Sequence, residues 1–319
     1  MENLSKTETT EKKDIKKVEA DLREMLSAKE IKTGEKLSKH TTFRIGGEAS
    51  IYVTPTDIES LKKIKQYCVG NGIYHYLLGR GSNVLFSDEG FEGVVIEFSN
   101  RLSEVKMLSD TQVEAQAGVS LAKLASFVAE KGLTGFEFAS GIPGTLGGAV
   151  TMNAGAYGGE IKDCIVSAVV LGDDGQERVL SKDELALGYR TSAVQTEGYV
   201  VLSAVLQFAK GEKNDILEKM RNLNNRRREK QPLEHGSAGS TFKRPEGYFA
   251  GKLIEDTGLR GYRIGDAMVS EKHCGFVVNV GNATAAEVMQ VISDVQSRVK
   301  EKFQVELEPE VRLIRCRQQ

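Results

Sequence analysis

Hydrophobic and polar positions in the first ninety residues follow two different periods. Apolar residues spaced three and four apart predict helices over residues 18–26 and 58–69, whereas short apolar runs predict strands over residues 51–53 and 73–78. The second strand runs directly into a glycine turn at residues 79–83. This order of strand, helix, strand and glycine turn predicts a small α/β unit.

Strand spacing dominates the middle of the chain, where a single helix is predicted over residues 121–131 and ended by Gly132. The tripeptide Asp173-Asp174-Gly175 is a turn signal typical of a β-hairpin. The predicted strands cover residues 94–98, 105–108, 113–117, 165–171, 177–180 and 199–208. This mixture predicts an α+β region.

A third pattern begins near residue 210. A polar helix is predicted over residues 215–230, where Pro232 stops it, and a loop-rich stretch follows with a short helical piece at 250–257. A strand at 276–280, an amphipathic helix at 284–303 and a last strand at 305–314 complete the chain.

The three patterns predict an α+β fold of three domains, because 319 residues exceed what one hydrophobic core usually supports. We expect domains at residues 18–92, 93–210 and 211–303, with the segment 304–319 returning to the first domain. Residues 1–17 are highly charged and are expected to form a disordered tail.

Charge and composition exclude several classes of partner. Lys and Arg number 43 against 45 Asp and Glu, so the net charge of −2 provides no overall field for nucleic acid or an anionic membrane. No apolar run approaches the roughly 20 residues that a membrane-spanning helix needs, and residues 1–20 lack the apolar segment of a secretory signal. We therefore expect a cytoplasmic protein. We also expect a monomer, while the sequence leaves an oligomer open.

Cysteine and histidine positions argue against a metal site or a disulfide framework. The four residues of each type are scattered, with no CxxC pair and no HExxH motif. We expect reduced thiols and no bound metal. These residues are Cys68, Cys164, Cys274, Cys316, His40, His75, His235 and His273.

Two glycine-rich segments are candidates for binding a phosphate-bearing cofactor. In residues 79–85 the glycines follow a strand and let the backbone approach a pyrophosphate, but Val84 stands where GxGxxG needs its third glycine. Such a turn can also be a plain loop. In residues 141–159 many small side chains let the chain wrap a large planar cofactor, although two turns around a glycine-rich helix are the alternative.

Further motifs follow in a fixed order, and together they cover roughly residues 30–315. They are Phe43-Arg44-Ile45-Gly46-Gly47, Gly188-Tyr189-Arg190-Thr191-Ser192, Lys230-Gln231-Pro232, Ala238-Gly239-Ser240-Thr241-Phe242-Lys243-Arg244-Pro245, Ala250-Gly251-Lys252-Leu253-Ile254 and Glu308-Pro309-Glu310-Val311-Arg312. With the glycine segments, they make the chain resemble the UDP-N-acetylenolpyruvoylglucosamine reductases, a family of vanillyl-alcohol-oxidase-like flavoproteins, in its shorter variant.

The resemblance implies that the first two domains form a two-part FAD-binding region and that the third is an α+β substrate domain. It implies non-covalent FAD and NADPH as cofactors. The implied cofactor-binding residues are Gly46, Gly47, Gly79, Arg80, Gly81, Ser82, Asn83, Val84, Gly141, Ile142, Pro143, Gly144, Thr145, Gly147, Gly148, Ala149, Asn153, Gly155, Ala156 and Tyr157.

The implied reaction belongs to bacterial cell-wall synthesis. NADPH reduces FAD, and reduced flavin passes hydride to C3 of the enolpyruvyl group of a UDP-sugar, while C2 receives a proton. By motif position, Ser240 is the candidate proton donor, and Arg190 and Glu310 are candidates for stabilising enolate charge. Ser240 could instead be a turn serine, and Glu310 could lie on a solvated strand face.

Basic side chains near these motifs are candidates for binding the diphosphates of the UDP-sugar and NADPH. We assign Tyr189, Lys230, Gln231, Lys243 and Arg244 to the substrate. Two alternatives remain open. One is a flavin oxidase acting on a sugar or alcohol, and the other is a flavin or nucleotide-sugar binding protein without turnover.

Overall fold

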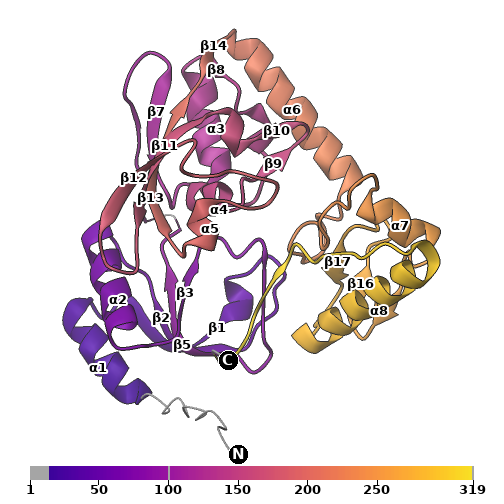
Figure 1. The fold of residues 1–319 in the computed structure, drawn as a ribbon, viewed down its shortest axis with the longest axis horizontal. Coiled ribbons are helices and arrows are strands. Elements are labelled where there is room, and N and C mark those ends of the chain that lie inside the picture. Colours follow the sequence, from indigo (N-terminus) through magenta and orange to yellow (C-terminus); the bar gives the residue numbers. More distant parts are fainter. Residues whose placement is uncertain (1–13, 100, 318–319) are drawn as a thin grey trace, which may run out of the picture.

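The computed structural model describes residues 14–99 and 101–317, which form three parts (Figure 1). The first part is a four-stranded sheet in the order β1-β2-β5-β3, in which β1 runs antiparallel to β2 and the other neighbours are parallel. Its strands are β1 (Ile31–Lys36), β2 (Glu48–Val53), β3 (His75–Leu78) and β5 (Phe91–Glu97).

Two helices, α1 (Ile15–Met25) and α2 (Ile58–Gly70), cover one face of this sheet. Their apolar residues share a core cluster with alternate residues of β2 and β5, such as Ile51 and Ile96. The opposite face carries Tyr52 and Leu78, which pack with Phe86 in a smaller cluster. Because side chains alternate across a strand, β2 contributes to both clusters.

The second part is a five-stranded antiparallel sheet in the order β12-β11-β13-β7-β6. Its core is continuous with the α1–α2 side of the first part. Its elements are β6 (Val105–Met107), β7 (Gln112–Gln116), α3 (Leu121–Glu130), α4 (Leu146–Thr151), β11 (Ile165–Leu171), β12 (Glu177–Ser181), α5 (Ala193–Thr196) and β13 (Val200–Gln207). Short pieces complete it: β8 (Leu133–Thr134) with β14 (Ala209–Lys210), β9 (Gly155–Ala156) with β10 (Gly159–Glu160), and the 3-10 turns Glu137–Ala139 and Ile161–Asp163.

Helix α6 (Lys213–Lys230) leads from the second part to the third (Figure 1). The third part combines a small antiparallel sheet with two helices, and Thr284 and Glu287 form a capping box at the start of α8. Its elements are α7 (Ala250–Asp256), β15 (Arg263–Ile264), β16 (Ala267–Val269), β17 (Val277–Asn279) and α8 (Ala285–Phe303).

The first part reaches into the third. Phe43, Ile45 and Leu85 lie in the core cluster of the third part, although all three belong to the N-terminal region. The Asp88 carboxylate accepts hydrogen bonds from the backbone N–H groups of Ala285 (2.7 Å) and Ala286 (2.9 Å), the first residues of α8. An acidic group there satisfies free N–H groups and complements the helix dipole.

The C-terminal segment returns to the first part (Figure 1). Strand β18 (Arg312–Ile314) pairs in parallel with β4 (Val84–Phe86), directly after the first glycine turn. The last strand therefore lies beside residues 84–86 of the N-terminal region. Only residues 312–314 of the expected strand 305–314 are regular, because residues 308–310 pair irregularly with 241–243 of the third part.

Several other predictions can be compared with the structure. β11 has the predicted ends, and the 173–175 turn does join it to β12. The expected break at residue 93 falls inside β5, which is a strand of the first sheet. Residues 15–17, expected in the tail, open α1, where Asp14 caps the helix. The rest of that predicted tail, residues 1–13, lies outside the described residues.

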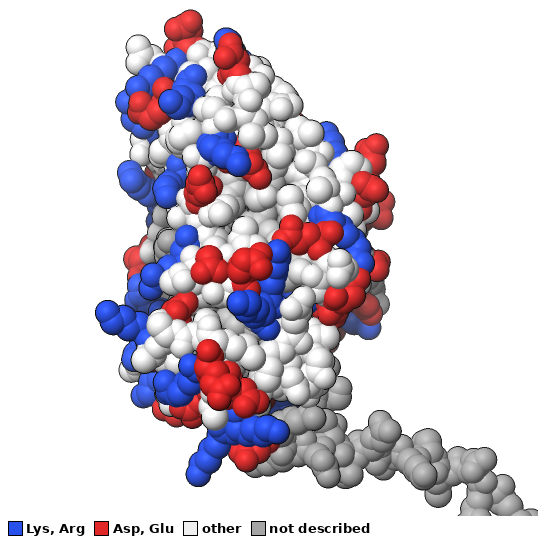
Figure 2. Space-filling view, turned by 90° about the vertical axis from the view of Figure 1, so that its left-hand side faces the viewer, with Lys and Arg blue, Asp and Glu red and all other residues white. Residues whose placement is uncertain are grey.

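Charges of both signs are interspersed on the face that Figure 2 shows, as the small net charge suggests. Within residues 14–99 and 101–317, no helix is long and apolar enough to cross a membrane. Over the same ranges, no group of three or more His, Cys, Asp and Glu side chains is arranged to hold a metal ion.

Candidate active site

The two glycine-rich segments lie side by side. A β-carbon built on Gly79 would lie 2.8 Å from Thr145 Oγ1, and one built on Gly144 would lie 3.9 Å from Ser82 Oγ. Residues 79–83 leave the end of β3, and Thr145 caps the short helix α4, so the first and second parts meet here. The family resemblance assigned both segments to one cofactor, and in the structure the two segments are neighbours.

The second glycine segment is held by backbone hydrogen bonds to its neighbours. Gly144 C=O accepts from Leu121 N–H (3.0 Å), and Gly147 N–H donates to Ala117 C=O (2.8 Å). The expected alternative of a glycine-rich helix also exists, as α4. Gly147 is required by packing, since its built β-carbon would lie 3.0 Å from that of Ala117, whereas Gly148 meets nothing closer than 3.6 Å.

The predicted cofactor residues of these segments divide by exposure. Those at least partly accessible can contact a ligand: Gly79, Arg80, Ser82, Asn83, Gly141, Ile142, Pro143, Gly144, Gly148, Gly155, Ala156 and Tyr157. The buried ones, Gly81, Val84, Thr145, Gly147, Ala149 and Asn153, shape the backbone instead. Tyr157 is an exposed large hydrophobic side chain of the set, with the Arg226 guanidinium 5.1 Å from its ring centre.

Glu310 joins all three parts of the molecule. Its carboxylate accepts from Arg190 Nε at 2.7 Å, and its backbone N–H donates to Thr241 C=O at 2.8 Å. Its backbone C=O accepts from Asn83 Nδ2 at 3.2 Å. Asn83 belongs to the first part, Arg190 to the second and Thr241 to the third. Residues far apart in the chain therefore converge on Glu310, although of the three only Arg190 contacts its carboxylate.

Burial raises the pKa of Glu310, whose side chain is 14% exposed, while Arg190 and Lys243 act to lower that pKa. Burial is the larger effect. The Arg190 guanidinium, which donates to the carboxylate from Nε at 2.7 Å, opposes this rise in the pKa of Glu310 because it favours the charged form. Such a pair in a largely dry site presents fixed charge to a ligand.

Arg190 lies in a strained turn that orients its side chain. The residue has φ of +57°, a conformation that L-residues seldom adopt, and its Nη2 also donates to Gly155 C=O at 3.4 Å. Asn153 fixes the turn by donating to Gly188 C=O (3.0 Å) and Glu160 (2.7 Å), while its own oxygen accepts from Lys162 N–H. The side chain of Asn153 is fully buried, and it positions Gly188.

Ser240 stands at an exposed bend between two fixed points. Within the described residues its hydroxyl has no hydrogen-bond partner, and Gly239 before it has φ of +77°. The bend is anchored by Ser237, which exchanges hydrogen bonds with Thr42, and by the buried Thr241. Thr241 is a residue that sequence reasoning passed over, although it links the Ser240 bend to Glu310.

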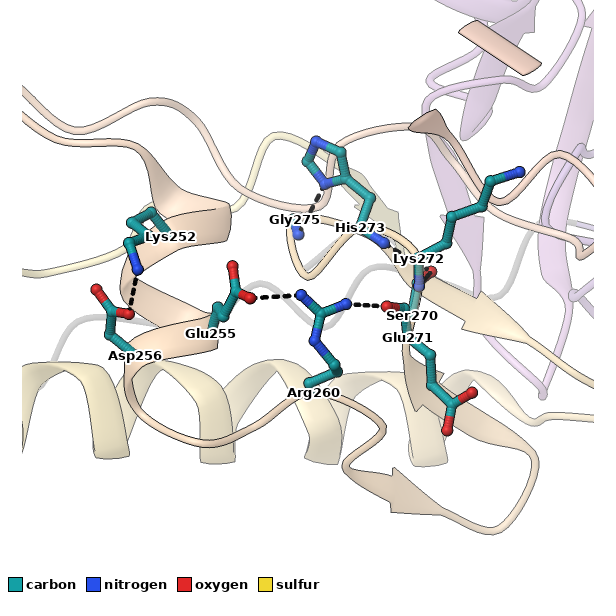
Figure 3. Close-up of polar contacts among 9 residues, drawn as sticks. All are labelled: Lys252, Glu255, Asp256, Arg260, Ser270, Glu271, Lys272, His273 and Gly275. Atoms are coloured by element: carbon teal, nitrogen blue, oxygen red, sulfur yellow. Dashed lines mark hydrogen bonds and ion pairs between the residues drawn. The ribbon is translucent and has the colours of Figure 1, made fainter. Parts of the chain in front are cut away.

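A compact turn at residues 270–275 supports Thr241 from the other side. Figure 3 shows the polar contacts of this turn. Thr241 N–H donates to Gly275 C=O at 2.8 Å, and Gly275 N–H donates to His273 Nδ1 at 3.1 Å. Ser270 Oγ accepts from the N–H groups of Lys272 and His273, and Arg260 ties the turn to α7 through Glu255. Burial lowers the pKa of His273.

The predicted substrate residues fall into two groups. Tyr189, Lys243 and Arg244 line a cavity of about 320 Å³ beside the Arg190–Glu310 pair, and Tyr189 Oη accepts from Arg244 N–H at 3.0 Å. Lys243 forms an ion pair with Glu308. Lys230 and Gln231 lie instead at the C-terminal end of α6.

Comparison with known proteins identifies the family. The UDP-N-acetylenolpyruvoylglucosamine reductase of Lachnoclostridium phytofermentans is 53% identical over 297 residues, covering 92% of this chain and 96% of that protein. The chain belongs to this family. The Clostridium tetani reductase is 49% identical and covers 92% of this chain and 95% of its own length. The reductase crystal structure from Thermus caldophilus matches with a TM-score of 0.75 and 35% identity, covering 88% of this chain and 97% of that one.

Two family models match separate stretches of the chain. The FAD binding domain matches residues 49–181, and the C-terminal domain of UDP-N-acetylenolpyruvoylglucosamine reductase matches residues 231–314. As a member of the UDP-N-acetylenolpyruvoylglucosamine reductase family, the chain is an FAD-dependent oxidoreductase that uses NADPH in peptidoglycan precursor synthesis.

The residues present fit such a cofactor. Gly144 and Gly148 leave room for close approach to their backbone. Gln231 Oε1 is buried, and no donor among residues 14–99 and 101–317 reaches it. A buried acceptor without a partner costs free energy unless a ligand supplies the donor. Gln231 is thus placed to accept a hydrogen bond from a bound molecule.

Gly46 and Gly47 are the remaining predicted cofactor residues, and they lie outside the two glycine-rich segments. They line a separate cavity of about 460 Å³ whose walls include neither glycine-rich segment. A β-carbon on Gly47 would lie 2.3 Å from Asp88 C=O, and one on Gly46 would lie 2.9 Å from Phe86 Cβ. Close packing of the first part explains both glycines without a cofactor.

Gly81 offers a test of how the first glycine turn is built. Its φ is +60°, and a β-carbon there would lie 2.1 Å from His40 C=O. Gly81→Ala should lower the free energy of unfolding by more than the about 1–2 kcal/mol that left-handed strain alone costs, because the backbone must shift as well. Urea unfolding, with FAD content measured in parallel, checks this.

Gly72→Ala is the matched control, since Gly72 has φ of +59° and nothing within 4 Å of its built β-carbon. The Gly72→Ala variant should lower the free energy of unfolding only by the cost of left-handed strain, and it should retain its FAD. Equal losses for the two variants would mean that contact with His40 does not determine the turn.

Proposed function

We propose that the chain reduces the enolpyruvyl group of UDP-N-acetyl-3-O-(1-carboxyvinyl)-glucosamine to give UDP-N-acetylmuramate, with Ser240, Arg190 and Glu310 as its catalytic residues. Membership of the reductase family supports the reaction. The observation that supports the residue roles is the position of Glu310, which contacts Arg190 through its carboxylate and Thr241, next to Ser240, through its backbone.

Bound FAD supplies the two-stage hydride transfer from NADPH to C3 of the substrate. The chain has two further tasks. Negative charge develops on the substrate carboxylate and C2 as C3 is reduced, and the fixed Arg190 guanidinium stabilises that charge because it needs no reorganisation. Ser240 Oγ then donates its proton to C2, which its lack of a competing partner favours.

The remaining assignments concern binding. Tyr189, Lys243 and Arg244 hold the UDP-sugar in the cavity that they line, with Lys230 at the end of α6 contributing charge. Residues 79–84 and 141–157 hold FAD, the former through their backbone at the diphosphate. We keep three proposed domains: residues 18–92 with 304–319, residues 93–210 and residues 211–303. Only the boundary between the first two changes, because strand Phe91–Glu97 belongs whole to the first. We further propose a monomer acting in the cytoplasm.

An absorption spectrum followed through both stages tests the proposal. The purified protein should be yellow, lose its visible absorption when NADPH is added without oxygen, and regain it when the enolpyruvyl UDP-sugar follows. A protein that FAD cannot reconstitute would overturn the proposal. Recovery of the spectrum with oxygen but not with the UDP-sugar would favour the oxidase instead.

A further inference from the structure

The turn that carries Arg190 is attached to the second part of the molecule on both sides of its tip. Before the tip, Gly188 C=O accepts a hydrogen bond from Asn153 Nδ2 at 3.0 Å. After the tip, Ser192 Oγ donates to Thr151 C=O at 2.8 Å. Asn153 and Ser192, here called the clamp residues, are buried, with exposed fractions of 0% and 1%. Two buried side-chain bonds therefore hold the turn, one on each side of Arg190.

Ser192 takes no part in the reaction proposed above, and its hydroxyl proton has a specific acceptor. Thr151 ends α4, so its C=O is one of the last carbonyls of the helix, which have no partner within it. Ser192 Oγ also accepts from Gln195 N–H at 3.4 Å as the cap of α5. A cap needs only an acceptor, so capping does not explain the donated proton, whereas attachment to Thr151 does.

Asn153 uses every polar group of its amide. Nδ2 donates to Gly188 C=O and to the Glu160 carboxylate (2.7 Å), and Oδ1 accepts from Lys162 N–H (2.9 Å). Its φ of +41° is one that Asn and Asp adopt more readily than most other residues. An ionised aspartate would keep the shape and the backbone but could donate to neither acceptor. The position therefore requires the two amide donors.

The clamp residues tie Arg190 to the segment proposed to hold FAD. Asn153 and the acceptor of Ser192 both lie in residues 141–157, and Arg190 Nη2 donates to Gly155 C=O in the same segment at 3.4 Å. Glu310 meets the turn at its tip, where it accepts from Arg190 Nε. The guanidinium is therefore held against the cofactor segment on one side and against Glu310 on the other.

We propose that Ser192 and Asn153 are positioning residues, which hold the Arg190 guanidinium at a fixed place relative to the flavin. The φ of +57° at Arg190 is strained, so the turn would relax unless its surroundings fixed it. Two buried bonds fix it, and the guanidinium then needs no reorganisation when negative charge develops on the substrate. Neither side chain touches substrate or cofactor, and both act through Arg190. The inference rests on the proposed catalytic role of Arg190.

A double-mutant cycle on the rate of the second stage tests this. Ser192→Ala should slow re-oxidation of the flavin by the enolpyruvyl UDP-sugar about tenfold, within the about 10²-fold that a misplacement of about 1 Å can cost. Flavin reduction by NADPH and the FAD dissociation constant should change by less than about twofold, because neither depends on Arg190. In an Arg190→Ala background the same change should slow the second stage by less than about twofold, since the guanidinium that it orients is gone.

Ser203→Ala is the matched control. It removes another buried hydroxyl from the second part, on β13, where the Ser203 hydroxyl donates to Glu114 rather than to the Arg190 turn or its support. Both stages should keep their wild-type rates. A slowed second stage in this control would show that any loss of a buried hydroxyl from this part disturbs the site, which would overturn the inference.

Asn153→Asp is a nearly isosteric second variant. It loses two donated bonds where Ser192→Ala loses one, so its second stage should be slower still while FAD stays bound. A weaker hold on FAD with an unchanged second stage would assign Asn153 to the cofactor and overturn the inference. So would an equal effect of Ser192→Ala with and without Arg190, although Arg190 would remain catalytic. A wild-type second stage in Arg190→Ala would overturn the proposed role of Arg190 as well.

Discussion

Ser240→Ala should lower the rate at which the enolpyruvyl UDP-sugar re-oxidises the flavin by about 10³-fold, which is the size typical of a lost general acid. The rate at which NADPH reduces the flavin should stay within about twofold, because that stage needs no proton from Ser240. Anaerobic stopped-flow absorbance separates the two stages. A split of this kind assigns Ser240 to the second stage alone.

The structure explains why one hydroxyl can have so large an effect. Ser240 is exposed at a bend, and its hydroxyl has no partner among the described residues, so no competing acceptor must be displaced before it donates. The bend is rigid because Ser237 and Thr241 are fixed on either side by hydrogen bonds to Thr42 and Gly275. Preorganisation of this kind converts a weak acid into an effective proton donor.

Ser237→Ala provides the matched control, because it removes a hydroxyl from the same bend while the backbone bonds to Thr42 remain. It should leave both stages close to wild type. Equal slowing of the two stages in Ser240→Ala would indicate distortion of the site, and loss of the second stage in Ser237→Ala would show that Ser240 is not the specific donor.

The sequence predicted those elements that are determined by residues close to one another in the chain. The run of β11 and the turn at residues 173–175 follow from strand alternation and turn chemistry, and the amphipathic helix expected over residues 284–303 is α8 (Ala285–Phe303). Motif order along the chain also selected Arg190, Ser240 and Glu310. In the structure Arg190 donates to the Glu310 carboxylate, and the Glu310 backbone N–H donates to Thr241, the residue after Ser240.

What sequence reasoning missed depends on contacts between distant segments. Nothing near Phe91 reveals that β5 inserts between β2 and β3, so the boundary at residue 93 was misplaced. Gly46 and Gly47 look like cofactor glycines until Asp88 and Phe86 are seen packed against them. Asn153 lies in a ligand-like motif, but its partners Glu160, Lys162 and Gly188 follow it by up to 35 residues.

Arg190→Lys should lower the rate of the second stage by about 10²-fold, with a smaller effect on flavin reduction by NADPH. Lysine keeps the positive charge but loses the rigid fork, which here donates to Glu310 from Nε and to Gly155 from Nη2. A point charge on a flexible stem must reorganise as enolate charge develops, and one lost donor of this kind costs about 10²–10³-fold. Arg178→Lys, in the exposed ion pair with Asp174, is the control and should have no effect.

Glu310→Gln separates positioning from charge in the same pair. Glutamine can still accept from Arg190 Nε but carries no charge, so the second stage should slow less than in Arg190→Lys. Since burial raises the pKa of Glu310, protonation of the wild-type carboxyl should begin above the usual carboxyl range as pH falls. The second-stage rate should therefore decline on the acid side in wild type, and Glu310→Gln should abolish that decline. A variant that keeps the wild-type acid limb would show that another group titrates there, and Glu310 would then act by shape alone.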